Sequence, residues 1–240
     1  MRTSDYIVSV INKFPKGYVF TYSDFNTEMK SEQAIIKTLN RLVAAGKISK
    51  LAKGKYYKPE QSILGELPPP QYQVVKDLLE DNGTPVGYLT GYSIYNKLGL
   101  TTQVSNTIQI GKNEVRPTFK RSRYTISFVK QKNTITKDNI PLLQLLDVIR
   151  YIKKIPDASL TNAVSRMLAI IEKLSTLEQQ KMVKLAMKYP PSTRALLGAI
   201  LEDCGAGFFE QLYKSLNPIT KYEFLSVNKV LRSTEKWNIV

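Results

Sequence analysis

The segment "SEQAIIKTLNRLVAAGKISKLAKGKYYKP" (residues 31–59) begins with the pattern of an amphipathic helix and ends with that of a basic hairpin. In its first half, apolar residues recur at three- and four-residue spacing between Ile35 and Val43, which predicts a helix with one buried face. Ser31 is a suitable N-cap, and Gly46 is a common residue just past a helix end. We therefore expect a helix that starts after Ser31 and stops before Gly46.

The second half of the segment, "KISKLAKGKYYKP", predicts two short strands joined by a tight turn near Lys53 and Gly54. Like charges repel, so a hairpin that is rich in lysine and lacks any acidic residue is easiest to explain if it binds a polyanion. Its basic residues are Lys47, Lys50, Lys53, Lys55 and Lys58.

The predicted helix also has a polar face, which admits two interpretations. One is an ordinary solvated face. The other is a surface that contacts nucleic acid, because Gln, Asn and Arg suit base edges, Lys suits phosphate, and small residues allow close approach to a groove. The residues of this face are Gln33, Ala34, Lys37, Asn40, Arg41 and Ala44.

The residues before this segment predict two further helices. Apolar spacing indicates one helix over residues 3–14, and "TYSDFNTEM" a second short one over residues 21–29. Three helices followed by a β-ribbon is the order of a winged helix-turn-helix. The three consecutive prolines of "LGELPPPQ" (residues 64–71) then indicate the end of this module, and a surface loop inside one domain is the alternative.

The remainder of the chain predicts an α+β protein. Helical patterns cover residues 71–82 and 90–99, and alternating apolar residues in "NTIQIG" and "RYTISFVKQ" predict strands. Five more helices are expected, over residues 139–155, 158–174, 176–189, 192–203 and 206–216. We accordingly expect a winged helix-turn-helix in residues 1–60, a mixed α/β segment in 61–138 and a helical region in 139–240, with 61–240 forming one domain.

Composition excludes several classes of function. The net charge is +15, which favours a polyanionic partner, most often nucleic acid. There is no histidine and one cysteine, Cys204, so imidazole catalysis is excluded and no metal site or cofactor is expected. No long apolar run and no signal peptide pattern occurs, so we expect a cytoplasmic protein without membrane contact.

A second basic block lies in "GKNEVRPTFKRSRYTISFVKQK" (residues 111–132), where Arg121 and Arg123 are expected on the strand face opposite Tyr124 and Ile126. This is either a solvated strand face or a second surface for phosphate or for an acidic partner. The basic residues proposed for it are Lys120, Arg121 and Arg123.

No catalytic site is evident. The chain lacks a Walker-type glycine-rich loop. Asp24, Glu28 and Lys30 only weakly match the acidic-and-lysine spacing of metal-dependent nucleases. We expect a protein that is not an enzyme; a nucleic-acid-processing subunit and a winged-helix adaptor for protein docking are the alternatives.

Several stretches together resemble the AbiEi family of antitoxins, which belong to type IV toxin–antitoxin pairs of bacterial abortive infection and phage defence. They include "PKGYVFTYSDF", "LVAAGKISKLAKGKYYKP", "RALLGAILEDCG" and "LNPITKYEF". The most specific is "TGYSIYNKLGLTTQ" (residues 90–103). The resemblance spans nearly the whole chain.

This resemblance implies a transcriptional autorepressor that binds inverted repeats in the double-stranded DNA of its own promoter. It also implies a cognate nucleotidyltransferase-like toxin, which such antitoxins often neutralise without a tight stoichiometric complex. Antitoxicity would lie beyond the proline-rich linker. The DNA-contacting residues by position are Ser31, Gln33, Lys37, Thr38 and Arg41, with Lys47, Lys50, Lys53 and Lys55 along the backbone.

Overall fold

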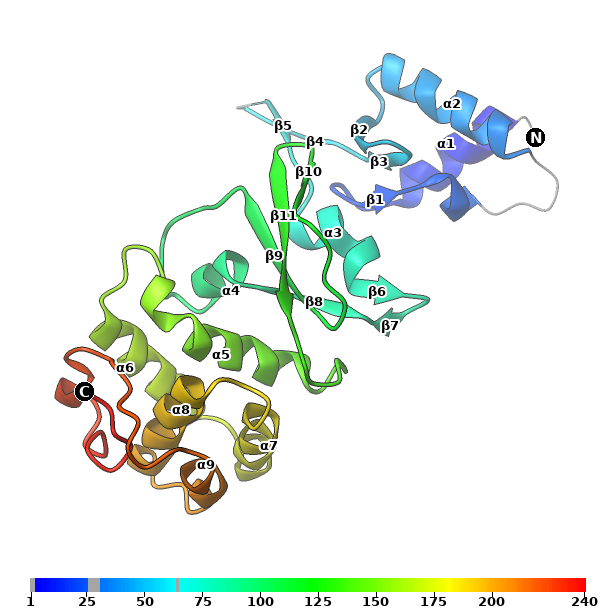
Figure 1. The fold of residues 1–240 in the computed structure, drawn as a ribbon. Coiled ribbons are helices and arrows are strands. Elements are labelled where there is room, and N and C mark those ends of the chain that lie inside the picture. The colour runs from blue at the N-terminus through cyan, green and yellow to red at the C-terminus, as the bar shows by residue number, and fades with distance from the viewer. Residues whose placement is uncertain (1–2, 26–30, 64) are drawn as a thin grey trace. The chain divides into compact units, whose positions relative to one another are not determined.

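The structure is a computed structural model that describes residues 3–25, 31–63 and 65–240. It is a mixed α+β protein with a helix and strands at its N-terminal end and a helical C-terminal region (Figure 1). The chain forms two compact units, one of Met1–Asp77 with Phe119–Thr125 and one of Leu78–Thr118 with Ile126–Val240.

The first unit contains a small three-stranded sheet, the helices α1 and α2, and most of the helix α3. Its strands are ordered β1-β3-β2, and both pairings are antiparallel. In chain order its elements are α1 (Thr3–Lys13), β1 (Val19–Phe20), the 3-10 helix η1 (Tyr22–Phe25), α2 (Glu32–Ala44), β2 (Ser49–Ala52), β3 (Lys55–Tyr57), β4 (Glu60–Ser62), β5 (Gly65–Leu67), most of α3 (Gln71–Leu79) and β10 (Phe119–Arg121).

The helix and hairpin predicted from residues 31–59 are both confirmed. The Ser31 hydroxyl accepts a hydrogen bond from the Ala34 amide at 3.3 Å, and so caps α2. Gly46, just beyond α2, has φ +66°, a left-handed value that favours glycine. Gly54, with φ +71°, sits in the β2–β3 turn. The apolar side of the unit buries Ile7, Ile11, Phe20, Phe25, Ile35, Leu39, Leu42, Ile48 and Tyr56 in one core.

Two other features of the first unit differ from the sequence-based picture. The second helix is the 3-10 turn η1, and the rest of its expected range, residues 26–30, lies outside the described residues. The proline stretch packs against the first unit and does not mark its end. Pro69 is buried, and a Cβ on Gly17 would lie 3.0 Å from Pro70 Cδ. The unit continues through α3 as far as Asp77.

The second unit combines sheet strands with helices. The four-stranded sheet has the order β10-β11-β9-β8, and β10 with the first residues of β11 belongs to the first unit. The remaining elements are β6 (Glu80–Asp81), β7 (Thr84–Pro85), β8 (Gly87–Thr90), α4 (Tyr92–Lys97), β9 (Thr107–Lys112), β11 (Tyr124–Lys130), α5 (Ile140–Arg150), η2 (Ile152–Lys154), α6 (Leu160–Ile171), α7 (Thr176–Ala186), α8 (Pro191–Asp203), α9 (Glu210–Lys214) and η3 (Val227–Lys229).

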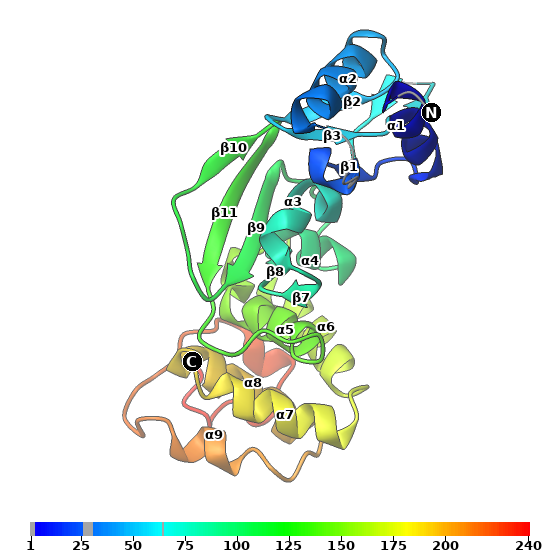
Figure 2. The same ribbon diagram turned by 90° about the vertical axis from the view of Figure 1, so that its right-hand side faces the viewer.

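Helix α5 is the centre of the second unit, since it packs on strand β8 and on helices α7 and α8 (Figure 2). Leu143 and Leu146, on its buried side, have no exposed surface. Helix α8 packs closely on Trp237, and a Cβ on Gly198 would lie 2.0 Å from the indole Cη2. Only glycine fits there.

The distinctive stretch "TGYSIYNKLGLTTQ" forms the end of β8, helix α4 and the turn after it. Gly91 has φ +63°, and a Cβ there would lie 1.8 Å from the Gln109 side-chain oxygen. Gly99, with φ +70°, ends α4, and Leu100 is buried directly after it. The two glycines and the leucine of this stretch are therefore explained by packing and turn geometry.

Candidate nucleic-acid interface

Helix α2 presents an exposed polar stripe. Gln33, Lys37 and Arg41 recur every four residues, so they lie above one another on one side of the helix. All three are exposed, whereas Ile35 and Leu39 are buried on the other side. The amphipathic split expected from the sequence is present, and the stripe is continuous along three turns.

The hairpin β2–β3 is fastened to α2 by a hydrogen bond. The Tyr56 hydroxyl donates to the Asn40 side-chain oxygen at 3.0 Å, and burial raises the pKa of this tyrosine. Tyr56 pairs across the ribbon with Lys50, and cross-strand partners share a face of a sheet. Lys50 therefore extends the side of the ribbon that meets α2.

Five cations of the helix and ribbon have no counter-charge in the part of the chain that the structure describes. No carboxylate from residues 3–25, 31–63 or 65–240 lies within 4.0 Å of their charged nitrogens, and all five are exposed. We call them the free basic set: Lys37, Arg41, Lys47, Lys50 and Lys53.

Two other lysines of the hairpin have internal partners. Lys55 forms an ion pair with Asp77 of α3 at 3.1 Å and is only partly exposed. Lys58 donates to the carbonyl oxygens of Asn12 at 2.9 Å and Phe14 at 3.0 Å, at the C-terminal end of α1. The hairpin is therefore less available to a polyanion than its composition indicates.

Two residues assigned to DNA contact have local roles in α2. Thr38 is 9% exposed, and its hydroxyl donates to the Ala34 carbonyl at 2.9 Å. Thr38 is one of the buried residues of α2, like Ile35 and Leu42, so its assignment to DNA contact stays a prediction that this burial does not favour. Ser31 is exposed, and its hydroxyl caps the helix.

The predicted second basic surface also needs correction, because Arg121 is buried. Its guanidinium forms two hydrogen bonds to the Asp77 carboxylate, at 2.6 and 3.0 Å, and a third to the Val74 carbonyl at 2.7 Å. Residues 122–123 form a turn, with Ser122 at φ +53°, so Arg121 and Arg123 do not lie on one strand.

The other two residues of that surface are exposed. Lys120 lies on β10 and Arg123 in the turn after it. The Arg123 guanidinium donates to the Tyr124 hydroxyl at 3.1 Å. Because Arg121 is buried, the exposed basic surface at this hairpin consists of Lys120 and Arg123 and is smaller than the sequence indicated.

Asp77 joins the ribbon to the β10–β11 turn region. Partial burial acts to raise the pKa of this carboxyl, but the hydrogen bonds from Arg121 and the positive charges of Arg121 and Lys55 outweigh burial and lower it. Asp77 thus stays ionised and neutralises two basic residues. Its partners lie 22 and 44 residues away, so no local sequence pattern identifies it.

The other face of the ribbon contacts the carboxylate of Glu66. Ser49 donates to Glu66 of β5 at 2.8 Å, and the Tyr57 hydroxyl donates to the same carboxylate. Burial, together with the hydrogen bond and negative charge of Glu66, raises the pKa of Tyr57 to about 12. Lys50 and Glu66 therefore lie on opposite faces of the ribbon.

Helix α2 brings Gln33 together with Lys37 and Arg41, two members of the free basic set, on one exposed side. In the described part of the chain, no three Cys, Asp or Glu residues are grouped so that they could hold a metal ion. Nor is any helix among the described residues long and apolar enough to span a membrane.

Comparison with known proteins gives a family and a fold. The model of a family described as "Family of unknown function (DUF6088)" matches residues 6–188. The crystal structure of the protein RV2827C from Mycobacterium tuberculosis is similar, with a TM-score of 0.57 and 13% sequence identity over 92% of this chain and 84% of that chain. At this identity the likeness concerns the fold alone. No curated protein matches the chain.

Proposed function

We propose that this chain, which belongs to the DUF6088 family of unknown function, is a DNA-binding antitoxin that represses its own promoter and neutralises a nucleotidyltransferase-like toxin. The observation that carries the DNA-binding part is the free basic set on α2 and the β2–β3 hairpin. Five exposed cations without counter-charges among the described residues are best compensated by a polyanion.

In this proposal the first unit is a winged helix-turn-helix. The order α1, η1, α2 and then the β2–β3 ribbon supports it. Helix α2 would be the recognition helix in the major groove, and the ribbon would be the wing along the neighbouring backbone. The Tyr56–Asn40 hydrogen bond would fix the angle between the two.

Each side chain then has a separate task. Gln33 and Arg41 would contact base edges, Arg41 by two parallel hydrogen bonds to guanine. Lys37, Lys50 and Lys53 would contact phosphates, which set the position of the protein without reading sequence. Lys55 is left out of this set because Asp77 already neutralises it.

The antitoxin part of the proposal rests on the resemblance carried by "TGYSIYNKLGLTTQ" and the stretches around it. We assign neutralisation of the toxin to the second unit, which holds this motif. The protein would not be an enzyme, and it would act by binding. Lys120 and Arg123 would form an auxiliary basic surface.

Fluorescence anisotropy with the chain's own upstream DNA and with random duplex tests the DNA-binding part. We expect tighter binding to upstream DNA, and Arg41→Ala should cost about 1–3 kcal/mol and relax the sequence preference. Lys173→Ala, an exposed lysine of the second unit, serves as the control. Equal affinity for the two duplexes at physiological salt would contradict repression.

Co-expression tests the antitoxin part. The proposal predicts a nucleotidyltransferase-like reading frame beside the gene, whose expression arrests growth unless this chain is present. Arg41→Ala should abolish repression of a promoter reporter but keep growth rescue. If the chain represses the reporter but fails to rescue growth, the proposal of DNA binding stands and the proposal of an antitoxin is refuted.

A further inference from the structure

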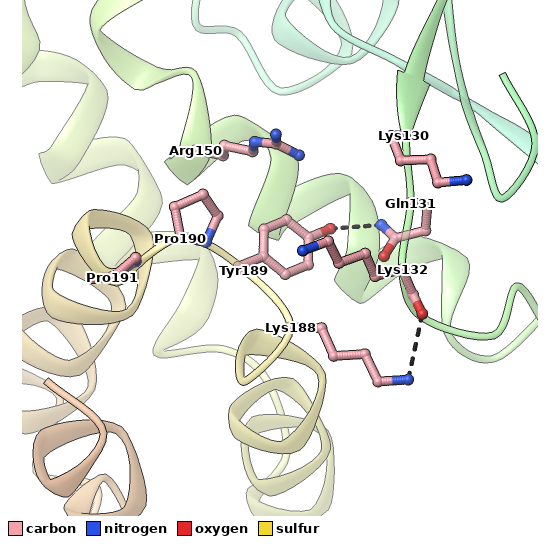
Figure 3. A pocket seen from close by; sticks show the side chains of 8 residues that line it. All are labelled: Lys130, Gln131, Lys132, Arg150, Lys188, Tyr189, Pro190 and Pro191. Atoms are coloured by element: carbon pink, nitrogen blue, oxygen red, sulfur yellow. Dashed lines mark hydrogen bonds between the residues drawn. The ribbon is translucent and has the colours of Figure 1, made fainter. Parts of the chain in front are cut away.

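A pocket of about 270 Å³ lies in the second unit, where the end of β11, the end of α5 and the connection from α7 to α8 meet. Figure 3 shows Tyr189 in the middle of the residues that line it, with cationic side chains around the ring. The lining residues are Lys130, Gln131, Lys132, Arg150, Lys188, Tyr189, Pro190 and Pro191.

The lining of this pocket carries four positive charges and no carboxylate. Two of the ammonium groups donate only to main-chain carbonyls: Lys188 to Lys132 at 3.3 Å, and Lys130 to Asn113. A carbonyl dipole orients an ammonium group but does not neutralise it. Four cations around one hollow repel each other unless an anion enters.

Two residues of the lining, Gln131 and Tyr189, belong to a buried polar network. Asp147 is 1% exposed and accepts hydrogen bonds from the hydroxyls of Tyr88 at 2.7 Å, Thr90 at 2.9 Å and Tyr189 at 2.9 Å. The Gln131 amide donates to the hydroxyls of Tyr88 and Tyr189, both at 2.8 Å. Three chain segments are thereby fixed to one carboxylate.

Three of the four cations of the pocket are next to a member of this network in the sequence, and the fourth lies one helical turn from one. Gln131 stands between Lys130 and Lys132, and Tyr189 follows Lys188. Arg150 lies three residues after Asp147, on the same side of α5. The buried residues therefore fix the backbone positions from which the cations project, so the positive charges are held together before any ligand arrives.

The network has no hydrogen-bond donor to spare for an anionic ligand. Both amide hydrogens of Gln131 are used, and its oxygen accepts from the Asn133 main-chain amide at 2.8 Å and side-chain amide at 3.0 Å. The Tyr189 hydroxyl donates to Asp147 and accepts from Gln131. Recognition must come from the cations, which favours a small and highly charged anion over a neutral metabolite.

We propose that this pocket binds an oligophosphate, either inorganic or as the phosphate chain of a nucleotide. Its volume lies slightly below the range of about 300–1,000 Å³ usual for drug-sized ligands, so a di- or triphosphate fits and a nucleoside would extend beyond it. A concave site between three segments suits a compact anion better than the convex backbone of a duplex. This inference is independent of the DNA-binding proposal.

Calorimetric titration of the full chain with sodium tripolyphosphate, pyrophosphate and ATP at constant ionic strength tests it. We expect saturable binding of tripolyphosphate and at least a tenfold loss of affinity in Lys132→Gln/Lys188→Gln. The matched control, Lys173→Gln/Lys229→Gln, removes two exposed lysines that do not line the pocket and should change affinity less than twofold. Tighter binding of ATP than of tripolyphosphate would identify a nucleotide, and equal or weaker binding an inorganic chain.

A second measurement does not depend on the variants. Tripolyphosphate should shift the amide resonances of Gln131, Lys132 and Lys188 in the wild-type chain more than those elsewhere. Absence of saturable binding for all three compounds would overturn the proposal, as would an equal loss in the control double variant. If the pocket variant loses duplex DNA affinity and the wild type shows no oligophosphate binding, the lysines serve DNA and the proposal is wrong.

Discussion

Asp77 and Asp147 each connect segments that are far apart in the chain, and they do so in opposite ways. Asp77, whose side chain is 36% exposed, takes up the charges of Lys55 and Arg121, and its pKa is lowered. Asp147 is buried and is held by three neutral hydroxyl groups. Burial raises its pKa, and the hydroxyl donors together with the positive charge of Arg150 only partly offset this effect.

The difference determines which basic residues remain available. In the first unit, Asp77 neutralises two cations, Lys55 and Arg121, and neither of them belongs to the free basic set. In the second unit, hydroxyl groups satisfy the carboxylate, so the cations beside Asp147 are not neutralised by it through direct contact. Asp77 neutralises the cations that it contacts, whereas Asp147 fixes the backbone positions from which the pocket cations project.

The largest expected effect comes from breaking the buried network. Asp147→Ala leaves three hydroxyl groups without their acceptor and should lower the free energy of unfolding of the second unit by about 2–4 kcal/mol. Asp147→Asn keeps the shape and one acceptor and should cost less. Urea unfolding followed by fluorescence of Trp237, the sole tryptophan and a residue of this unit, measures both. Asp138→Ala, an exposed neighbour, should be nearly neutral.

A smaller loss is expected at Asp77. Asp77→Asn leaves the buried Arg121 guanidinium without a counter-charge, which we expect to cost about 1–3 kcal/mol after allowing for the partial exposure of Asp77. Amide hydrogen exchange of Tyr56 and Leu39 reports the first unit. Asp81→Asn, an exposed acid a few residues further on, is the control. A loss as large as that of Asp147→Ala would remove the distinction between the two acids.

Salt dependence of DNA binding gives a third and weaker test. Lys53→Gln should reduce the slope of log affinity against log salt concentration by about 0.9, as expected for one lost phosphate contact. Lys55→Gln should reduce it less, because Asp77 already neutralises that lysine. Equal slopes for the two variants would mean that the Lys55–Asp77 ion pair opens when DNA binds.

The smallest effect concerns pH, and the two acids should give opposite signs. Because the folded pKa of Asp77 is lowered, its contribution is complete above the ordinary value of about 3.9 and is lost as pH falls through the folded pKa. Because the folded pKa of Asp147 is raised, its contribution declines as pH rises from about 3.9 through the folded pKa. Asp77→Asn and Asp147→Asn should each flatten one of these trends in pH-dependent unfolding.

Local sequence patterns predicted much of the first unit and little of its ion pairing. The α2 helix, its Ser31 cap and the turn at Gly54 follow from periodicity and from residues with special backbone preferences, which act within a few positions. The buried Arg121 is paired with Asp77, which is 44 residues away in the chain, and local sequence patterns cannot relate residues at that separation. The expectation of an exposed arginine followed from β-alternation, which a turn interrupts.

The oligophosphate pocket could be predicted only in part. Asp147 lies within the mostly apolar "LLQLLDVI" of α5, and a carboxyl at a core position indicates a buried polar partner. The partners themselves, Gln131 and Tyr189, belong to segments that the fold alone brings together.

The discontinuous first unit has a consequence for how the protein is made. Its last piece, Phe119–Thr125, supplies Arg121 to Asp77 only after a long stretch of the second unit has been synthesised. Ribosomes extend a chain at about 5–20 residues per second, and part of the chain stays inside the exit tunnel. The N-terminal helices therefore emerge several seconds before Arg121. During that interval the Arg121–Asp77 hydrogen bonds cannot form, and Lys55 is the ion-pair partner of Asp77 that has already been synthesised.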